Sequence, residues 1–504
     1  MQDTAGTWLM AVLTTSPLLI ALMQTAASLP VLFLGLPAGA TADIFDRRRL
    51  LIFWQAWMLA AVGLLSVLTM FGVISPAVLL VLTFLLNIGS AMNNPAWQAI
   101  VPELVPREEL PDAIALNSAG FNLARAVGPA LGGLAVAAFT SAQAGAAVVF
   151  LLNSASFLAV IWVLYAWKRT PLFKSALPSE RIFGSIRSGA RYVRHSPPLR
   201  AVLLRAFLFT GSASAVWALL AVVAQQDLHA GAMAYGVLNG CLGIGAVLGA
   251  MLLPRLRRQV AAEWMVGAAA AIFIGTLTTL ALTRNVPLIV FSLIAAGCAW
   301  TTTTSTLNIA VQLSVPAWVQ ARALGAYQMI FAGGMAAGSA LWGLIAERAS
   351  NQVALLAAAG AMLLGGVVVR RFPLLRGTPP DLSPYQLAHP VQPVLRPEPK
   401  EGPVLILIEY RIRLADKAEF TRAVHALRSI RMRDGAIRWG VFQDTAQPET
   451  FLETFMMESW LDFLRSRERL TLADRVVRDH VRSLHQGEDD PRVSRMIYSS
   501  ESEA

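Results

Sequence analysis

The chain has 504 residues, of which 56% are hydrophobic and only 14% are charged, and its formal net charge is +10. A soluble protein of this length would carry about 25% charged residues, so the composition excludes an ordinary soluble enzyme. Cys241 and Cys298 both lie in apolar runs, which excludes a disulfide framework. The excess positive charge is typical of loops that face anionic lipid, and nucleic-acid binding is not expected.

The first apolar stretch, residues 1–13, is too short to cross a bilayer, and a Thr-Thr-Ser-Pro sequence at 14–17 ends it. The loops that follow require Thr15 to lie outside the cell. We therefore expect a truncated first helix with Asp3 in mid-membrane. The alternative is that residues 1–13 lie only at the membrane interface.

The apolar runs that follow each have about the ~20 residues that a membrane-spanning helix needs. With the first helix they predict about twelve spans. Basic residues gather in alternate linkers, including 168–198, whereas the opposite linkers hold only Arg284 and Arg348. The positive-inside rule therefore places the basic linkers and the C-terminus in the cytoplasm, in an inner (plasma) membrane protein. The runs cover residues 18–38, 50–71, 77–92, 113–140, 146–167, 199–224, 234–253, 264–282, 288–311, 324–346 and 353–369.

The membrane region, residues 1–372, consists of two halves, 1–167 and 199–372, joined by the cytoplasmic loop 168–198. Residues of GATADIFDRRR and of AVGPALGG recur 210 positions later. Chance similarity between Gly-rich helices explains any single pair, but several pairs at one offset predict a parallel-repeat transporter. The pairs are Gly39 with Gly249, Arg47 with Arg257, Arg48 with Arg258, Gly128 with Gly338 and Gly133 with Gly343.

A Pro-rich linker, residues 373–402, precedes a region of different periodicity. Strands are predicted at 404–413, 436–444, 449–459 and 492–499, and helices at 415–435 and 460–485. The βαββαβ order predicts a ferredoxin-like domain over 403–499. The fold class is therefore an all-α multi-pass membrane bundle with a small α+β domain behind it.

The first loop resembles the major facilitator superfamily signature Gly-x-x-x-Asp-Arg-x-Gly-Arg-Arg, although Ile44 and Asp46 depart from its Arg and Gly. The resemblance covers residues 1–370 and indicates the enterobactin- and drug-exporter-like branch. It implies a latch that forms when the cytoplasmic side is shut, in which Asp43 engages a helix N-terminus of the other half. The gating candidates are Gly39, Asp43, Arg47, Arg48, Arg257 and Arg258.

The stretch GPALGG resembles the Gly-Pro pattern of exporters in this superfamily. Its glycines allow close approach of a neighbouring backbone, and its proline permits a bend. Leu85 stands where proton-coupled drug exporters commonly carry Arg, which argues against the usual proton relay. The residues of this exporter motif are Gly128, Pro129, Gly132 and Gly133.

Polar side chains within spans are rare and point to a cavity. Arg125 shares a helical face with Asn122, and Asp3 is its candidate counter-charge. The alternative is a buried Arg that holds two helices together. Because polar residues occupy corresponding places in both halves, we expect a cavity between the halves. The candidates are Asp3, Gln24, Asn94, Asn122, Arg125 and Asn308.

The C-terminal region resembles the dimeric αβ-barrel group that includes small antibiotic-biosynthesis monooxygenases. This resemblance implies a homodimer formed through an uncovered sheet face. Ile437, Trp439, Val441 and Gln443 are expected on that face, because they alternate along the predicted strand. The alternative is that the sheet packs on the linker or on loop 168–198.

Together these features predict a secondary transporter that exports a small amphipathic, siderophore-like or drug-like molecule by alternating access. No Gly-x-x-x-x-Gly-Lys-Ser/Thr loop occurs, which argues against an ATP motor. Catalytic residues, metal ligands and cofactors are not expected, and the partners are the substrate and the lipid bilayer. The alternative is a membrane-tethered sensor or a monooxygenase-like enzyme acting through the C-terminal domain.

Overall fold

The computed structural model describes residues 1–104, 109–167, 182–372, 374, 381–383, 385, 397–487 and 489–498. Most of the predicted Pro-rich linker and the first part of loop 168–198 lie outside these residues. The chain divides into two compact units. The first holds residues 1–179, 201–309 and 327–374, and the second holds 180–200, 310–326 and 375–504.

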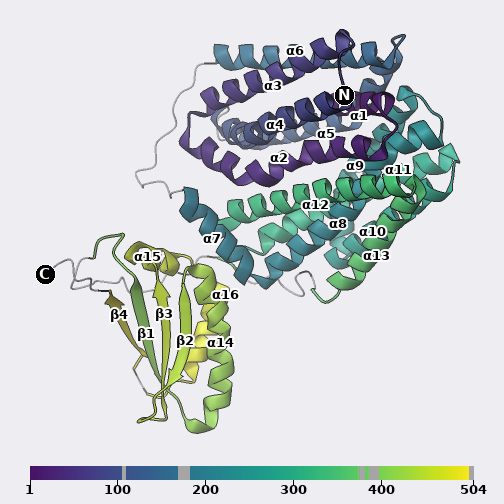
Figure 1. Ribbon diagram of the computed structural model, residues 1–504. Coiled ribbons are helices and arrows are strands. Elements are labelled where there is room, and N and C mark those ends of the chain that lie inside the picture. The colour runs from purple at the N-terminus through teal and green to yellow at the C-terminus, as the bar shows by residue number, and fades with distance from the viewer. Residues whose placement is uncertain are drawn as a thin grey trace. The chain divides into compact units, whose positions relative to one another are not determined.

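Long helices build the first unit, and each of the runs predicted as a span forms one of them (Figure 1). Those of the first half are α1 (Gln2–Leu13), α2 (Pro17–Ile44), α3 (Arg47–Met70), α4 (Pro76–Leu104), α5 (Leu110–Ala137) and α6 (Ala142–Ala166). Those of the second half are α8 (Pro197–Val222), α9 (Ala232–Gln259), α10 (Ala262–Leu282), α11 (Val286–Leu313), α12 (Gln320–Arg348) and α13 (Asn351–Val369).

Ten of these helices, counted over the described residues, are long and apolar enough to cross a membrane. The other two are α1, which has 12 residues, and α5, whose apolar part within the described residues is Val127–Ala137. At 1.5 Å per residue α1 covers about 18 Å, less than the ~30 Å hydrocarbon core. The first helix is therefore short, as predicted, and the described residues form a helix at each predicted span.

Side chains define where α2 and α3 begin. The Ser16 hydroxyl accepts a hydrogen bond from the Leu19 N–H, and Pro17 follows at the first helical position of α2. Asp46 caps α3 by accepting from the Arg49 N–H at 2.9 Å. Asp46 is one of the two departures from the superfamily signature, and its role here is to start α3.

The repeat in the sequence corresponds to a repeat in packing. A Cβ on Gly128 of α5 would lie 3.3 Å from the Met1 backbone at the start of α1. A Cβ on Gly338 of α12 would collide with the backbone of Gly211 in α8. Both partners of the second contact stand 210 positions after those of the first. The fifth helix of each half thus packs on the first helix of that half through the same small residue.

The second unit contains a four-stranded antiparallel sheet with strand order β2-β3-β1-β4. Its elements are β1 (Val404–Arg411), α14 (Lys417–Asp434), β2 (Arg438–Gln443), β3 (Thr450–Met457), α15 (Trp460–Glu468), α16 (Leu472–Ser483) and β4 (Arg492–Ile497). This is the predicted ferredoxin-like arrangement, in which β3 lies between β1 and β2. The helices cover one face, where Phe420, Val424 and Leu427 of α14 are buried against the strands (Figure 1).

The predicted helix 460–485 is two helices, because Thr471 begins a new one. Its hydroxyl accepts from the Asp474 N–H, and the Asp474 carboxylate accepts from the Thr471 N–H. This capping box makes a break more favourable than a continuous helix.

The prediction for the uncovered sheet face was wrong, because the alternate residues of the strand lie on that face. Trp439 pairs with Phe455 and Val441 with Glu453, both of which are buried. The Trp439 ring also packs edge-on against His425 of α14, with centroids 5.2 Å apart. Trp439, Val441 and Gln443 therefore lie on the face that the helices cover, whereas Ile437 precedes β2 and is exposed. The open face carries the alternate residues Leu405, Leu407, Phe442, Leu452, Met456 and Met496.

Helix α7 (Ile182–His195), from the loop between the halves, packs on the C-terminal domain within the second unit. The Arg191 guanidinium donates to the Gly435 carbonyl, which follows α14. Arg187 forms an ion pair with Glu458 at 2.8 Å. The buried Tyr192 ring packs edge-on against Trp318, with centroids 5.7 Å apart.

Candidate functional site

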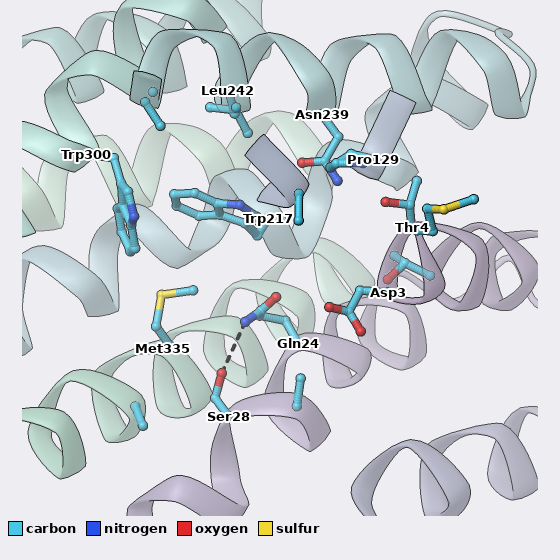
Figure 2. Close-up of a pocket in the computed structure, with 18 of the residues that line it drawn as sticks. Asp3, Thr4, Gln24, Ser28, Pro129, Trp217, Asn239, Leu242, Trp300 and Met335 are labelled. Carbon is cyan, nitrogen blue, oxygen red and sulfur yellow. Dashed lines mark hydrogen bonds between the residues drawn. The ribbon is translucent and has the colours of Figure 1, made fainter. Parts of the chain in front are cut away.

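A cavity of about 520 Å³ lies between the two halves of the first unit (Figure 2). Helices α1, α2 and α5 of the first half and α8, α9, α11 and α12 of the second half supply its walls. Its volume falls within the ~300–1,000 Å³ typical of sites for drug-sized ligands.

One side of the cavity is polar and comes mainly from the first two helices. Asp3 of α1 and Gln24 and Ser28 of α2 line it, and Figure 2 shows them on the purple N-terminal helices. The Gln24 side chain donates a hydrogen bond to the Ser28 hydroxyl at 3.1 Å. Asn239 of α9 and Gln328 of α12 add carboxamides from the second half. These groups can accept and donate hydrogen bonds, and Asp3 supplies the negative charge on this wall.

The opposite side is aromatic and belongs to the second half. Trp217 of α8 and Trp300 of α11 lie together with ring centroids 4.4 Å apart (Figure 2). Phe331 of α12 packs edge-on against Trp300, with ring centroids 5.4 Å apart. Phe209, outside the cavity lining, packs on Trp300 with ring centroids 5.9 Å apart. Such a wall can stack on a planar or bulky apolar ligand.

The predicted cavity residues fall into three groups. Asp3 and Gln24 line the cavity. Asn94 of α4 and Asn308 of α11 are placed outside its lining, and both have polar partners of their own. Asn122 and Arg125 belong to α5, but their side chains lie outside the described part of the structure.

The aromatic wall, Asn239 and Gln328 were not among the predicted cavity residues. A signal for the wall was present, because tryptophans of membrane helices usually lie at the interfaces. Trp217 and Trp300 instead lie well inside α8 and α11.

Among the exporter-motif residues, Pro129 lines the cavity and the glycines make close helix contacts. A Cβ on Gly132 would lie 2.8 Å from the Met1 carbonyl oxygen, and one on Gly133 would lie 2.6 Å from Gly236 Cα. The second contact joins α5 to α9 across the two halves. Only glycine permits this approach.

The gating candidates lie at the far end of the helices from Thr15. Arg48 donates to the Leu164 and Tyr165 carbonyls, at 2.7 and 2.6 Å, and so caps α6 of its own half. A Cβ on Gly39 would meet nothing within 4 Å. The Asp43 side chain lies outside the described part, and Arg47 has a polar contact.

The corresponding arginines of the second half differ in burial. One guanidinium nitrogen of Arg257 is buried and has no hydrogen-bond partner among the described residues, whereas Arg258 is exposed. At the opposite end of the bundle, polar contacts join the halves. Ser16 donates to Glu347 at 2.7 Å, and Gln226 donates to the Thr15 carbonyl at 3.0 Å.

Known proteins of similar fold are membrane transporters. A nucleoside transporter, NupG, superposes with a TM-score of 0.58 at 13% identity and covers 74% of this chain and 94% of its own. A D-xylose–proton symporter gives a TM-score of 0.57 at 12% identity, over 73% of this chain and 94% of its own. At these identities the likeness concerns the fold alone.

Relatives in sequence are also transporters. The multidrug efflux pump Tap of Mycolicibacterium fortuitum is 26% identical over 73% of this chain and 90% of its own length. An uncharacterized MFS-type transporter, YfiS of Bacillus subtilis, is 26% identical over 72% and 88%. The staphyloferrin A transporter of Staphylococcus aureus is 26% identical over 46% and 57%.

The family described as transmembrane secretion effector matches residues 1–503, which is almost the whole chain. The helical bundle, the paired halves and the central cavity agree with that match. The chain is therefore a multi-pass membrane protein that belongs to the transmembrane secretion effector family of major facilitator transporters.

Proposed function

We propose that this protein exports a small amphipathic molecule, of siderophore-like or drug-like chemistry, across the inner membrane. The observation that carries this proposal is the composition of the cavity between the halves. A carboxylate and carboxamides on one wall face tryptophans on the other, so one ligand can satisfy both polar and aromatic contacts. The efflux and siderophore transporters among the relatives support this substrate class.

The position of the cavity supports transport by alternating access. A site between two repeated bundles is reached from one side of the membrane at a time when the bundles rock against each other. Contacts of Ser16 and Gln226 hold the halves together at the Thr15 end, which supports an outer gate there. The latch at the other end would use Asp43 against the second half, with the half-buried Arg257 guanidinium as a candidate partner.

The basic linkers support a cytoplasmic location for the latch, for α7 and for the C-terminal domain. In that orientation the latch would form when the protein opens outward. The open apolar face of the sheet supports a homodimer through the C-terminal domains.

Uptake into everted membrane vesicles tests the export proposal. The panel would contain a macrolide, staphyloferrin A, a cationic dye and a neutral dye of similar size, each measured with and without an imposed pH gradient. We expect accumulation of at least one amphipathic compound above that in vesicles without the protein. Trp300→Ala should reduce this accumulation at least tenfold, whereas Trp162→Ala, which removes an exposed tryptophan of α6, should not. Equal accumulation with and without the protein for the whole panel would contradict the proposal.

A further inference from the structure

A second cavity, of about 180 Å³, lies inside the C-terminal domain between the sheet and the helices that cover it. Its apolar surface comes from Ile406 and Ile408 of β1, Phe455 of β3 and Phe463 of α15. All residues that line it belong to the second unit, so it is separate from the cavity between the transporter halves. The volume is below the ~300–1,000 Å³ of drug-sized sites, which favours a ligand of one or two rings.

Four arginines line this small cavity from four different elements. They are Arg431 of α14, Arg467 of α15, Arg478 of α16 and Arg495 of β4. Burial, and then the charges of Arg495 and Arg478, lower the pKa of Arg467. Burial and the charge of Arg431 likewise lower the pKa of Arg478. The guanidinium groups are therefore close enough to repel one another in a partly dry space.

The buried carboxylates of the domain are engaged with other groups. Glu453 accepts from Arg431 at 3.1 Å and from the Trp439 indole N–H at 3.1 Å. Asp434, the carboxylate that lines the cavity, pairs with Arg433 at 2.9 Å.

Two of the cavity arginines remain available for a ligand. Within the described part of the chain, the half-buried Arg478 side chain takes part in no ion pair closer than 4.0 Å. Arg495 lies over the Phe463 ring at 5.9 Å, which leaves its donors free to turn to an anion. The cavity thus holds more positive charge than its own carboxylates neutralise.

We propose that this cavity binds a small organic anion, a carboxylate on a planar apolar body. The Arg478 and Arg495 guanidinium groups would hold the carboxylate, since their planar forks match its two oxygens. The apolar body would lie against Phe455 and Phe463. The C-terminal domain would then be a ligand-binding domain attached to a transporter, and its ligand need not be the transported molecule.

Calorimetric titration of the full chain in lipid nanodiscs tests this site, with 2-naphthoate as the probe. The matched neutral probe is 2-naphthol, and empty nanodiscs give the correction for partition into lipid. We expect 2-naphthoate to bind at least tenfold more tightly than 2-naphthol. Arg478→Met should weaken binding of 2-naphthoate at least tenfold, and Arg478→Lys should recover part of it.

Two control variants locate the effect. Arg475→Met removes the same charge from the same helix outside the cavity, at a residue that is 50% exposed, and should bind normally. Trp300→Ala alters the transport cavity and should also leave binding unchanged. If Arg478→Met does not fold, the exposed Arg495→Met serves in its place. Undetectable binding, equal affinity for the two probes, or loss of binding in Trp300→Ala but not in the arginine variants would overturn the proposal.

Discussion

At the residue scale, Asp3 is the carboxylate that the described structure places on the wall of the transport cavity. A charge within the membrane is costly and is retained where it serves a function. Asp3→Asn keeps the size of the side chain and removes the charge. We expect transport of a cationic substrate to fall at least tenfold, which corresponds to about 1.4 kcal/mol, while transport of a neutral one is unchanged.

Vesicle uptake of a matched cationic and neutral dye would measure this difference. The control is Asp227→Asn, which removes a carboxylate paired with Arg284 at 3.2 Å away from the cavity. An equal loss for both dyes would show that Asp3 acts only on folding.

Asp434 gives a prediction for the pH dependence of stability. Burial raises its pKa to about 6, although the Arg433 charge opposes the shift. A free aspartate has a pKa of about 3.9, so between about pH 4 and 6 the folded domain keeps a proton that the unfolded chain has lost. The contribution of Asp434 to the free energy of unfolding therefore falls as the pH rises through this window.

The asparagine of Asp434→Asn cannot ionise, so the variant should lack this decrease in the free energy of unfolding. Relative to wild type, the variant should gain stability between pH 4 and pH 7. Scanning calorimetry of the full chain would measure the unfolding transition of the C-terminal domain. That transition is the one missing from a chain that ends at residue 402. The control is Asp479→Asn, an exposed carboxylate of α16. A variant that becomes less stable than wild type as the pH rises would contradict the prediction.

At the element scale, α5 and α9 cross between the halves at a pair of glycines. A Cβ on Gly133 would lie 2.6 Å from Gly236 Cα and 2.8 Å from the Ala232 carbonyl oxygen. Because both atoms are backbone, Gly133→Ala must push the helices apart. We expect a melting temperature several degrees lower and reduced transport.

Gly360→Ala in α13 is the matched control, since its Cβ would meet nothing within 4 Å. That change should be neutral or stabilise by up to ~1 kcal/mol, as alanine favours the helix. Equal melting temperatures for the two variants would show that α5 and α9 can move apart at this contact without loss of stability.

Helix α7 offers a second test at this scale. Arg191 donates to the carbonyl of Gly435, a residue with φ of +136° that ends α14. Arg191→Met should loosen α7 on the C-terminal domain and increase hydrogen exchange across residues 187–195. Arg194→Met, at an exposed site on the same helix, should not. Unchanged hydrogen exchange in Arg191→Met would mean that the Arg187–Glu458 pair and Tyr192 are sufficient to hold α7 on the C-terminal domain.

At the scale of the whole molecule, the open face of the sheet determines the expected oligomeric state. Phe442 and Met496 lie on this face and are 60% and 52% exposed. Sheets whose open face is apolar usually pair with a partner. We expect the full chain to sediment as a dimer in detergent, and Phe442→Lys with Met496→Lys to make it a monomer.

Val476→Lys is the control for this prediction, since it adds a charge at a residue of α16 that is 70% exposed. It should leave the dimer intact. A chain ending at residue 402 should be monomeric. A monomeric wild-type chain at micromolar concentration would contradict the homodimer.

Hydrophobic runs and local signals determined much of this molecule. A helix that crosses a bilayer needs an uninterrupted apolar run, so the runs alone located the long helices of the bundle. The offset between Gly128 and Gly338 correctly indicated two equivalent helices. The break at Thr471 also has a local signal in the sequence, the spacing of Thr471 and Asp474 that forms a capping box. The continuous helical period of residues 460–485 nevertheless predicted one helix there.

The tertiary structure decided which residues meet. Trp217, Trp300 and Asp3 come from three helices far apart in sequence, and no local pattern brings them to one cavity. The open sheet face was misassigned because a strand alternates with a period of two, and pairing with β3, rather than the strand itself, sets which parity the helices cover. The arginines of the C-terminal cavity likewise lie on four elements, so only the folded domain collects their charge.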